Sequence, residues 1–280
     1  MILIADSGST KTDWAIINEN NEIQEFKSEG LNPYFASDSD ISQIIQKTFA
    51  NFEGKEKVSE IHFYGAGCNS KEKNSILKVA LKNTFPTDKI EVDSDILGAA
   101  KSLFQNDAGI AVILGTGSNS CEYDGAKIAK NIGSFGYILG DEGSGSNIGK
   151  NFISAYLNNE LPEKVKRQFE MDYRLNVGEI IENVYRKPNP NRFLASFTKF
   201  IADYYTEDET LEMIVSECFY DLFTRKLTKY ELKKHKIGFI GSVAYYFSDL
   251  LKEVADEFNV EIIKIEKSPM KGLIEFHSKH

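Results

Sequence analysis

The sequence predicts an α/β protein built from two related domains, and two observations lead to this fold class. Three short strands with a polar, glycine-containing turn open the chain, and the same layout recurs from about residue 109. Helices that alternate with strands follow each opening, as in a sheet with helical connections. The two copies share layout rather than sequence, so we expect two similarly built domains, covering residues 1–108 and 109–280.

Apolar runs predict the strands of the first domain, and apolar residues three or four apart predict its helices. The predicted strands are 2–6, 13–18, 22–27, 60–64 and 90–93, and the predicted helices are 41–52, 71–84 and 95–104.

The second domain repeats the pattern with a long helical addition. Asp124-Gly125 is a hairpin turn signal between two short strands. Residues of about 150–235 are mostly helical and form a predicted insertion. The predicted strands are 109–114, 119–123, 126–131, 236–240 and 260–265, with helices at 242–258 and after Pro269.

Composition excludes several function classes. The net charge of −9 disfavours binding to nucleic acid or to an acidic membrane, because both require a basic face. No signal peptide and no membrane-spanning run are visible in the sequence. The three cysteines form no CxxC pair, which argues against a zinc or iron–sulfur site within one chain and favours a reducing cytoplasm.

Glycine-rich loops are the main functional signal. Half of the 20 glycines lie between Gly109 and Gly149. Glycine lets a backbone approach a ligand closely, and successive backbone N–H groups form an anion-binding concavity. One such loop in each domain suits a polyphosphate, whereas each loop alone is also compatible with an ordinary turn.

Five motifs in order resemble those of the actin-like sugar kinase superfamily, and most of all the N-acetylglucosamine kinase branch of the BadF/BadG/BcrA/BcrD ATPases. They are DSGSTKT at 6–12, VDSDILGAA at 92–100, ILGTGSNS at 113–120, GSFGYILGDEGSGSNIG at 133–149 and FIGSVAYYF at 239–247. The resemblance implies two ribonuclease H-like domains around an interdomain cleft. It also implies that the last helix, about 269–280, packs on the N-terminal domain.

The resemblance implies ATP and Mg²⁺ as cofactors. Asp6 would hold Mg²⁺ through water, although a turn-capping role is the alternative. The residues implied for ATP are Ser7, Gly8, Ser9, Thr10, Lys11 and Thr12 in the first loop, Gly115, Thr116 and Gly117 in the second, and Gly241, Ser242 and Tyr245 in the adenosine motif.

Asp95 matches the catalytic base of the family. Phosphoryl transfer needs a base within hydrogen-bond reach of the attacking hydroxyl. A carboxylate at the start of a helix is also an ordinary cap, and Asp93 is the rival base on sequence alone. The residues implied for sugar binding are Asn32, Asp95, Ser118, Asn119, Phe135, Gly136, Tyr137, Ile138 and Asp141.

The predicted function is therefore ATP-dependent phosphorylation of an amino sugar, first of all N-acetylglucosamine at its 6-hydroxyl. Glucosamine and N-acetylmuramic acid remain open as substrates. Two other functions compete: an ATP-hydrolysing activator of an acyl-CoA dehydratase or reductase, and a sugar sensor without catalysis. The expected partner is the small-molecule sugar, and a homodimer with a second copy of the chain is left open. No nucleic acid and no membrane are expected as partners.

Overall fold

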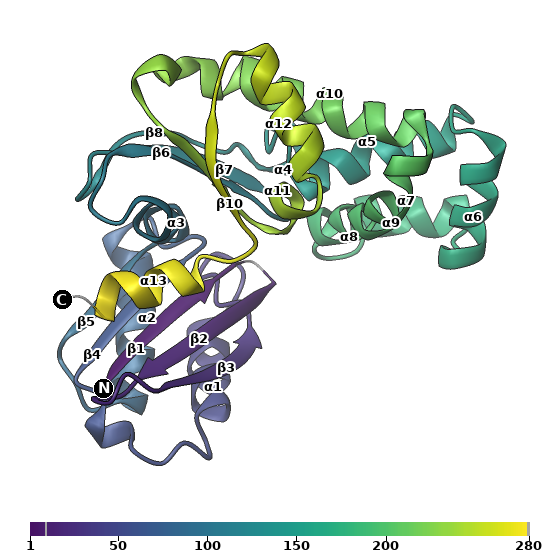
Figure 1. The fold of residues 1–280 in the computed structure, drawn as a ribbon. Helices are drawn as coiled ribbons and strands as arrows, with labels where there is room; N and C mark the ends of the chain where they lie inside the picture. The colour runs from purple at the N-terminus through teal and green to yellow at the C-terminus, as the bar shows by residue number, and fades with distance from the viewer. Residues whose placement is uncertain (9, 279–280) are drawn as a thin grey trace. The chain divides into compact units, whose positions relative to one another are not determined.

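The computed structural model describes residues 1–8 and 10–278, and the chain divides into two compact units. Unit 1 comprises Met1–Ala108, Tyr123–Ala129 and the C-terminal segment from Ser268, and unit 2 comprises Gly109–Glu122 and Lys130–Lys267. Each unit is built on a five-stranded sheet, and Figure 1 shows helices packed beside these sheets. The predicted α/β fold class is confirmed. No helix in the described ranges is long and apolar enough to cross a membrane.

Unit 1 has a sheet in the order β3-β2-β1-β4-β5. Its elements are β1 (Ile2–Ser7), β2 (Lys11–Ile17), β3 (Ile23–Glu29), α1 (Asp38–Thr48), β4 (Glu60–Gly65), α2 (Lys71–Thr84), β5 (Ile90–Ser94), α3 (Asp95–Phe104) and α13 (Met270–Ser278). Strands β1, β4 and β5 are parallel, while β2 and β3 are antiparallel to their neighbours.

Helices cover both faces of the unit 1 sheet, because residues 2–5 of β1 point alternately to the two faces and all four are apolar. Leu3 and Ala5 belong to the core under α1 and α2. Ile4 belongs to a second core with Met270 and Leu273 of α13. The C-terminal helix therefore completes unit 1.

Unit 2 has a sheet in the order β10-β9-β6-β7-β8. With β6 to β10 matched to β1 to β5, this is the same topology as in unit 1. Its elements are β6 (Gly109–Leu114), β7 (Ser118–Tyr123), β8 (Ile128–Ile132), α4 (Gly136–Leu139), α5 (Gly145–Leu157), α6 (Glu163–Tyr173), α7 (Val177–Tyr185), α8 (Pro190–Ser196), α9 (Thr198–Tyr204), α10 (Glu209–Arg225), β9 (Ile237–Ile240), α11 (Ser242–Tyr246), α12 (Ser248–Glu257) and β10 (Ile262–Glu266).

The close packing of α5 on α8 depends on Gly149. A Cβ atom at this position would lie 1.9 Å from the backbone oxygen of Leu194. Because the obstacle is backbone, we expect Gly149→Ala to destabilise unit 2 by about 3 kcal/mol, the upper part of the range for overpacked cores. Chemical denaturation measures this. Gly178→Ala in α7 is the control, because its nearest neighbour is the Asn176 side chain at 3.1 Å. Equal stability of the two variants would contradict the packing argument.

Candidate functional site

The two carboxylates predicted for chemistry, Asp6 and Asp95, lie at one edge of the unit 1 sheet. Strands β1, β4 and β5 are parallel, so their carboxyl ends meet there. Asp6 is next to last in β1, and Asp95 is the first residue of α3, directly after β5. In parallel sheets, ligands bind outside the carboxyl ends of the strands.

Burial raises the pKa of Asp95 to about 6, and the backbone N–H of Ile96, which donates to Oδ1 at 2.8 Å, opposes the rise. Ser94 is the N-cap residue of α3, yet within the described part of the chain its side chain makes no capping hydrogen bond. Gly98, in the first turn of α3, is required by packing, because a Cβ at this position would lie 2.7 Å from the ring of Tyr64. Asp95 is thus a partly buried carboxylate with a pKa suited to accepting a proton.

Asp6 has an even higher pKa, raised to about 7, chiefly by burial and next by the charges of Asp95 and Asp13. Two neighbouring carboxylates that resist ionisation suit a bound cation, which would relieve their repulsion. The described residues contain no cluster of three acidic, histidine or cysteine ligands. The donors therefore fit Mg²⁺, which binds through one or two carboxylates together with water and phosphate.

The turn between β1 and β2 is held by its own side chains. The hydroxyl of Ser7 lies 2.8 Å from that of Thr12, which donates to the Glu29 carbonyl at 2.9 Å. Gly8 donates its N–H to the Lys11 carbonyl at 3.0 Å. Lys11 is exposed and pairs with Asp13 at 2.5 Å. Thr10 is also exposed, and Ser9 lies outside the described residues.

Asn32 is buried beside the loop that follows β4. Its Oδ1 accepts the N–H of Tyr34 at 3.0 Å. A Cβ on Gly67, whose φ is +82°, would lie 2.4 Å from the same oxygen. The hydrogen bond within its own turn therefore fixes the orientation of the Asn32 side chain, and Gly67 leaves the space that this side chain occupies.

In unit 2 the second glycine loop and the adenosine motif emerge side by side. Strands β6 and β9 are parallel neighbours, with Ile113 opposite Ile240, so Gly115 and Gly241 follow their carboxyl ends. Gly241 has a φ of +125°, and a Cβ there would lie 2.1 Å from the Leu114 carbonyl oxygen. Only glycine permits this approach.

The second loop is tied to the start of α5. Gly145 donates its N–H to the Gly115 carbonyl at 2.8 Å, and Ser146 donates to the Thr116 carbonyl at 3.0 Å. Among the residues that the structure describes, nothing lies within 4 Å of a Cβ built on Gly115, so the loop has open space beside it. A loop of this kind leaves backbone donors available to an anion.

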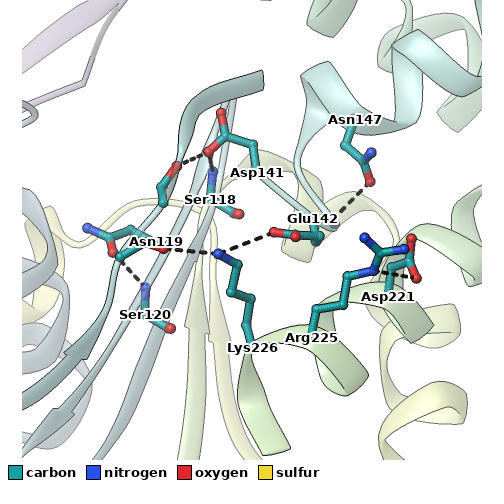
Figure 2. A network of polar contacts seen from close by, with 12 residues as sticks. Ser118, Asn119, Ser120, Asp141, Glu142, Asn147, Asp221, Arg225 and Lys226 are labelled. Atoms are coloured by element: carbon teal, nitrogen blue, oxygen red, sulfur yellow. Dashed lines mark hydrogen bonds and ion pairs between the residues drawn. The ribbon is translucent and has the colours of Figure 1, made fainter. Parts of the chain in front are cut away.

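Asp141 faces this loop with one oxygen already engaged (Figure 2). Its Oδ1 accepts the Ser118 N–H at 3.3 Å and the Ser134 hydroxyl. No hydrogen bond within the described residues reaches Oδ2, which would lie 3.0 Å from a Cβ on Gly117. Burial raises the pKa of Asp141, while these two donors oppose the rise. Asp141 thus offers a free carboxylate oxygen to a ligand hydroxyl.

The other residues predicted for the sugar are more exposed. Phe135 is 67% exposed and Ile138 69%, on either side of Gly136, whose φ is +76°. Tyr137 and Ile138 also line a hollow of about 410 Å³ against α5, α7 and α8. Asn119 uses its Oδ1 to accept the Ser120 N–H and the Asn131 amide.

The adenosine motif presents aromatic surface. Ser242 is exposed, and Tyr245 is 49% exposed with its ring against that of Tyr246. Lys267 donates to the Tyr246 hydroxyl at 2.5 Å and lies over both rings. A cation and two half-exposed rings beside Gly241 form a surface suited to a nucleobase.

Sequence reasoning missed three residues that brace these loops: Glu142, Lys226 and Tyr230. Lys226 is buried and 3.6 Å from Glu142, and Tyr230 donates to the Ser120 carbonyl at 2.8 Å. Glu142 lay within a recognised motif, but Lys226 and Tyr230 belong to the segment without any motif. Their only sequence signal is position beyond the end of a helix, which is too common to single them out.

Comparison with known proteins shows which proteins the chain resembles in sequence and fold. A curated N-acetylmuramic acid/N-acetylglucosamine kinase from Clostridium acetobutylicum is 26% identical over 285 residues, which cover 95% of this chain and 93% of the relative. The crystal structure of a candidate N-acetylglucosamine kinase from Porphyromonas gingivalis is 40% identical, with a TM-score of 0.94 over 100% of this chain and 99% of that one.

A second candidate N-acetylglucosamine kinase, from Chromobacterium violaceum, shares the fold at 13% identity, with a TM-score of 0.77 over 98% of each chain. The family model of the BadF/BadG/BcrA/BcrD ATPases matches residues 5–270. From this match over nearly its whole length, the chain belongs to the BadF/BadG/BcrA/BcrD ATPase family.

Proposed function

We propose that this protein is an ATP-dependent sugar kinase that phosphorylates the 6-hydroxyl of an N-acetylated amino sugar, foremost N-acetylglucosamine, with Asp95 as general base. The observation that carries the proposal is the partly buried Asp95 carboxylate, with a pKa of about 6, where the carboxyl ends of the parallel strands of unit 1 meet. The names of the Clostridium acetobutylicum and Porphyromonas gingivalis relatives support the sugar class.

In the proposed reaction, Asp95 accepts the proton of the sugar hydroxyl as its oxygen attacks the γ-phosphorus of ATP. The new oxygen–phosphorus bond forms, the bond to the bridging oxygen breaks, and ADP leaves with that electron pair. The oxygen Oδ2 of Asp141 accepts a hydrogen bond from another sugar hydroxyl. Backbone donors at 115–117 and in the β1–β2 turn hold phosphate oxygens.

Asp6 is the residue proposed to hold Mg²⁺. When bound, the ion neutralises charge that develops on the phosphates. The nearby charge of Asp95 raises the pKa of Asp6 further and increases the demand of its carboxylate for a cation. The exposed surface formed by Tyr245 and its neighbours receives the adenine.

The competing activator function requires cysteine thiolates for an iron–sulfur cluster shared between two chains. All three cysteines, Cys68, Cys121 and Cys218, are buried. Burial raises the pKa of Cys68 and of Cys218 to about 12, so neither is a ready thiolate ligand. The observations favour the kinase, and the purified protein should contain no stoichiometric iron.

The test is a panel of sugars with ATP and Mg²⁺, read by ADP release and by mass spectrometry of the product. We expect turnover of N-acetylglucosamine. N-acetylmuramic acid is the second expected substrate, because the name of the Clostridium acetobutylicum relative includes it. Glucosamine tests whether the acetyl group is required. Sugar binding without ADP release would favour the sensor, and iron-dependent ATP hydrolysis would favour the activator. Sedimentation of the same preparation tests whether the chain forms the homodimer that the sequence analysis allows.

A further inference from the structure

Lys226, which follows α10, is a buried cation that contacts both ends of one loop. Its side chain is 6% exposed. At the start of the loop, Nζ donates to the Gly133 carbonyl at 3.0 Å and lies 4.3 Å from the centre of the Phe135 ring. At the end of the loop it lies 3.6 Å from Oε2 of Glu142 (Figure 2).

Glu142 depends on this lysine. Its Oε2 is buried and has no hydrogen-bond partner among the described residues, so Lys226 is the cation that balances its charge. A buried carboxylate without a counter-charge is costly. Glu142 directly follows Asp141, whose backbone has a φ of +59°. A shift of Glu142 would therefore move the Asp141 carboxylate.

The same segment also holds the strands that lead into the loop. The Tyr230 hydroxyl accepts the Ile132 N–H at 2.8 Å and donates to the Ser120 carbonyl at 2.8 Å. Burial raises the pKa of Tyr230 to about 12, so it stays a neutral donor. Residues 226–230 thus brace β7, β8 and the loop 133–142 from one side.

We propose that Lys226 is a positioning residue for sugar recognition: by holding Gly133 and Glu142, it fixes the loop 133–142 so that Oδ2 of Asp141 meets a sugar hydroxyl. This inference rests on the proposed function. A displaced Asp141 would lose the hydrogen bond to the sugar, whereas the first phosphate loop, between β1 and β2, is built within unit 1. The effect on sugar binding should therefore be larger than the effect on ATP binding.

The decisive variant is the double substitution Lys226→Met with Glu142→Gln, which removes both charges and keeps the side-chain lengths similar. Lys226→Met alone leaves Glu142 unpaired, so its failure to fold would not be informative. We expect the KM for the sugar to rise about 10- to 100-fold, the usual scale for a misplaced binding group, and the KM for ATP to rise by a smaller factor. Lys226→Arg keeps the charge, so its KM for the sugar should lie between those of the parent and the double variant.

A deoxy sugar distinguishes the loss of the Asp141 hydrogen bond from a non-specific loss of sugar affinity. The parent should discriminate at least tenfold against an analogue that lacks the hydroxyl bound by Asp141, and the double variant should lose most of this discrimination. The matched control is Lys234→Met, which breaks an exposed ion pair with Glu231 of 2.8 Å and should change neither value. A folded double variant with parental sugar KM and parental discrimination would overturn the proposal.

A measurement without catalysis keeps this inference distinct from the proposed function. Amide hydrogen exchange at residues 133–142 should be at least tenfold faster in the double variant than in the parent and in Lys234→Met. If no sugar is turned over by the parent, the proposed function fails, while the exchange comparison still decides whether Lys226 fixes the loop. Unchanged exchange would overturn the positioning role.

Discussion

Replacing Asp95 with Asn should lower the rate of sugar phosphorylation by about 10²- to 10⁴-fold, the usual contribution of a general base. Asn keeps the size of the side chain and can still accept the Ile96 N–H at Oδ1. It cannot take up a proton from the sugar hydroxyl. Steady-state rates measure the loss, and calorimetry should find sugar and ATP still bound, because the change affects the transition state more than the ground state.

Asp93→Asn is the matched control, two residues earlier and within β5, opposite Tyr64 of β4. It changes the same functional group at the same sheet edge and should retain most of the activity. If Asp93→Asn is inactive while Asp95→Asn phosphorylates sugar at nearly the parental rate, Asp93 is the base and the assignment of Asp95 is wrong.

Helices and strands were predictable where the local spacing of apolar residues matches the face that the element buries in the core. The predicted helices 71–84 and 95–104 and the strand 109–114 have the bounds that the structure gives to α2, α3 and β6. The helix predicted from residue 41 instead begins at Asp38, because Ser37 and Asp40 form a capping box. The helix predicted over 242–258 is divided at Phe247, a buried residue that ends α11 and precedes α12.

The candidate site was predictable only in part, because motifs show which loops matter and not what supports them. The glycine loops identified Gly241, and the structure adds the reason, a close approach to Leu114. Ser7 and Thr12 were predicted from their hydroxyls, but the sequence does not reveal that these hydroxyls bond to each other. Lys226 lies 84 residues after Glu142, and only folding brings the two together.

Replacing Asp6 with Asn should make the protein more stable above neutral pH and at the same time less active. Burial, followed by the charges of Asp95 and Asp13, raises the pKa of Asp6 from 3.8 to about 7. A carboxyl group with a raised pKa stabilises the folded state below its unfolded pKa, and this stability is lost as the pH rises through 7. Asn carries no charge at any pH, so the variant avoids that loss.

The expected gain at pH 8, without Mg²⁺, is on the order of 2 kcal/mol after allowance for partial solvent exposure, and it should vanish as the pH falls to 4. Denaturant unfolding between pH 4 and pH 8 measures it. Asp88→Asn is a surface control of opposite sign, because the bond to Lys82 lowers the pKa of Asp88 and its loss should slightly destabilise the protein above pH 4. An Asp6→Asn variant less stable than the parent at every pH would contradict the assignment of a strained carboxylate.

Activity should move in the other direction, because the carboxylate that destabilises the free protein is the one proposed to hold Mg²⁺. We expect kcat/KM of Asp6→Asn to fall by about 10²-fold at low Mg²⁺ and to recover in part as Mg²⁺ is raised, since the phosphates still bind the ion. Mg²⁺ should also stabilise the parent at pH 8 more than the variant, because an ion stabilises the folded state more when it binds that state more tightly. Loss of activity that Mg²⁺ does not relieve, with equal stabilisation of both proteins by the ion, would remove Asp6 from the metal site. If Asp6→Asn is more stable and slower than the parent, the Asp6 carboxylate lowers the stability of the free protein and is kept because the reaction needs it.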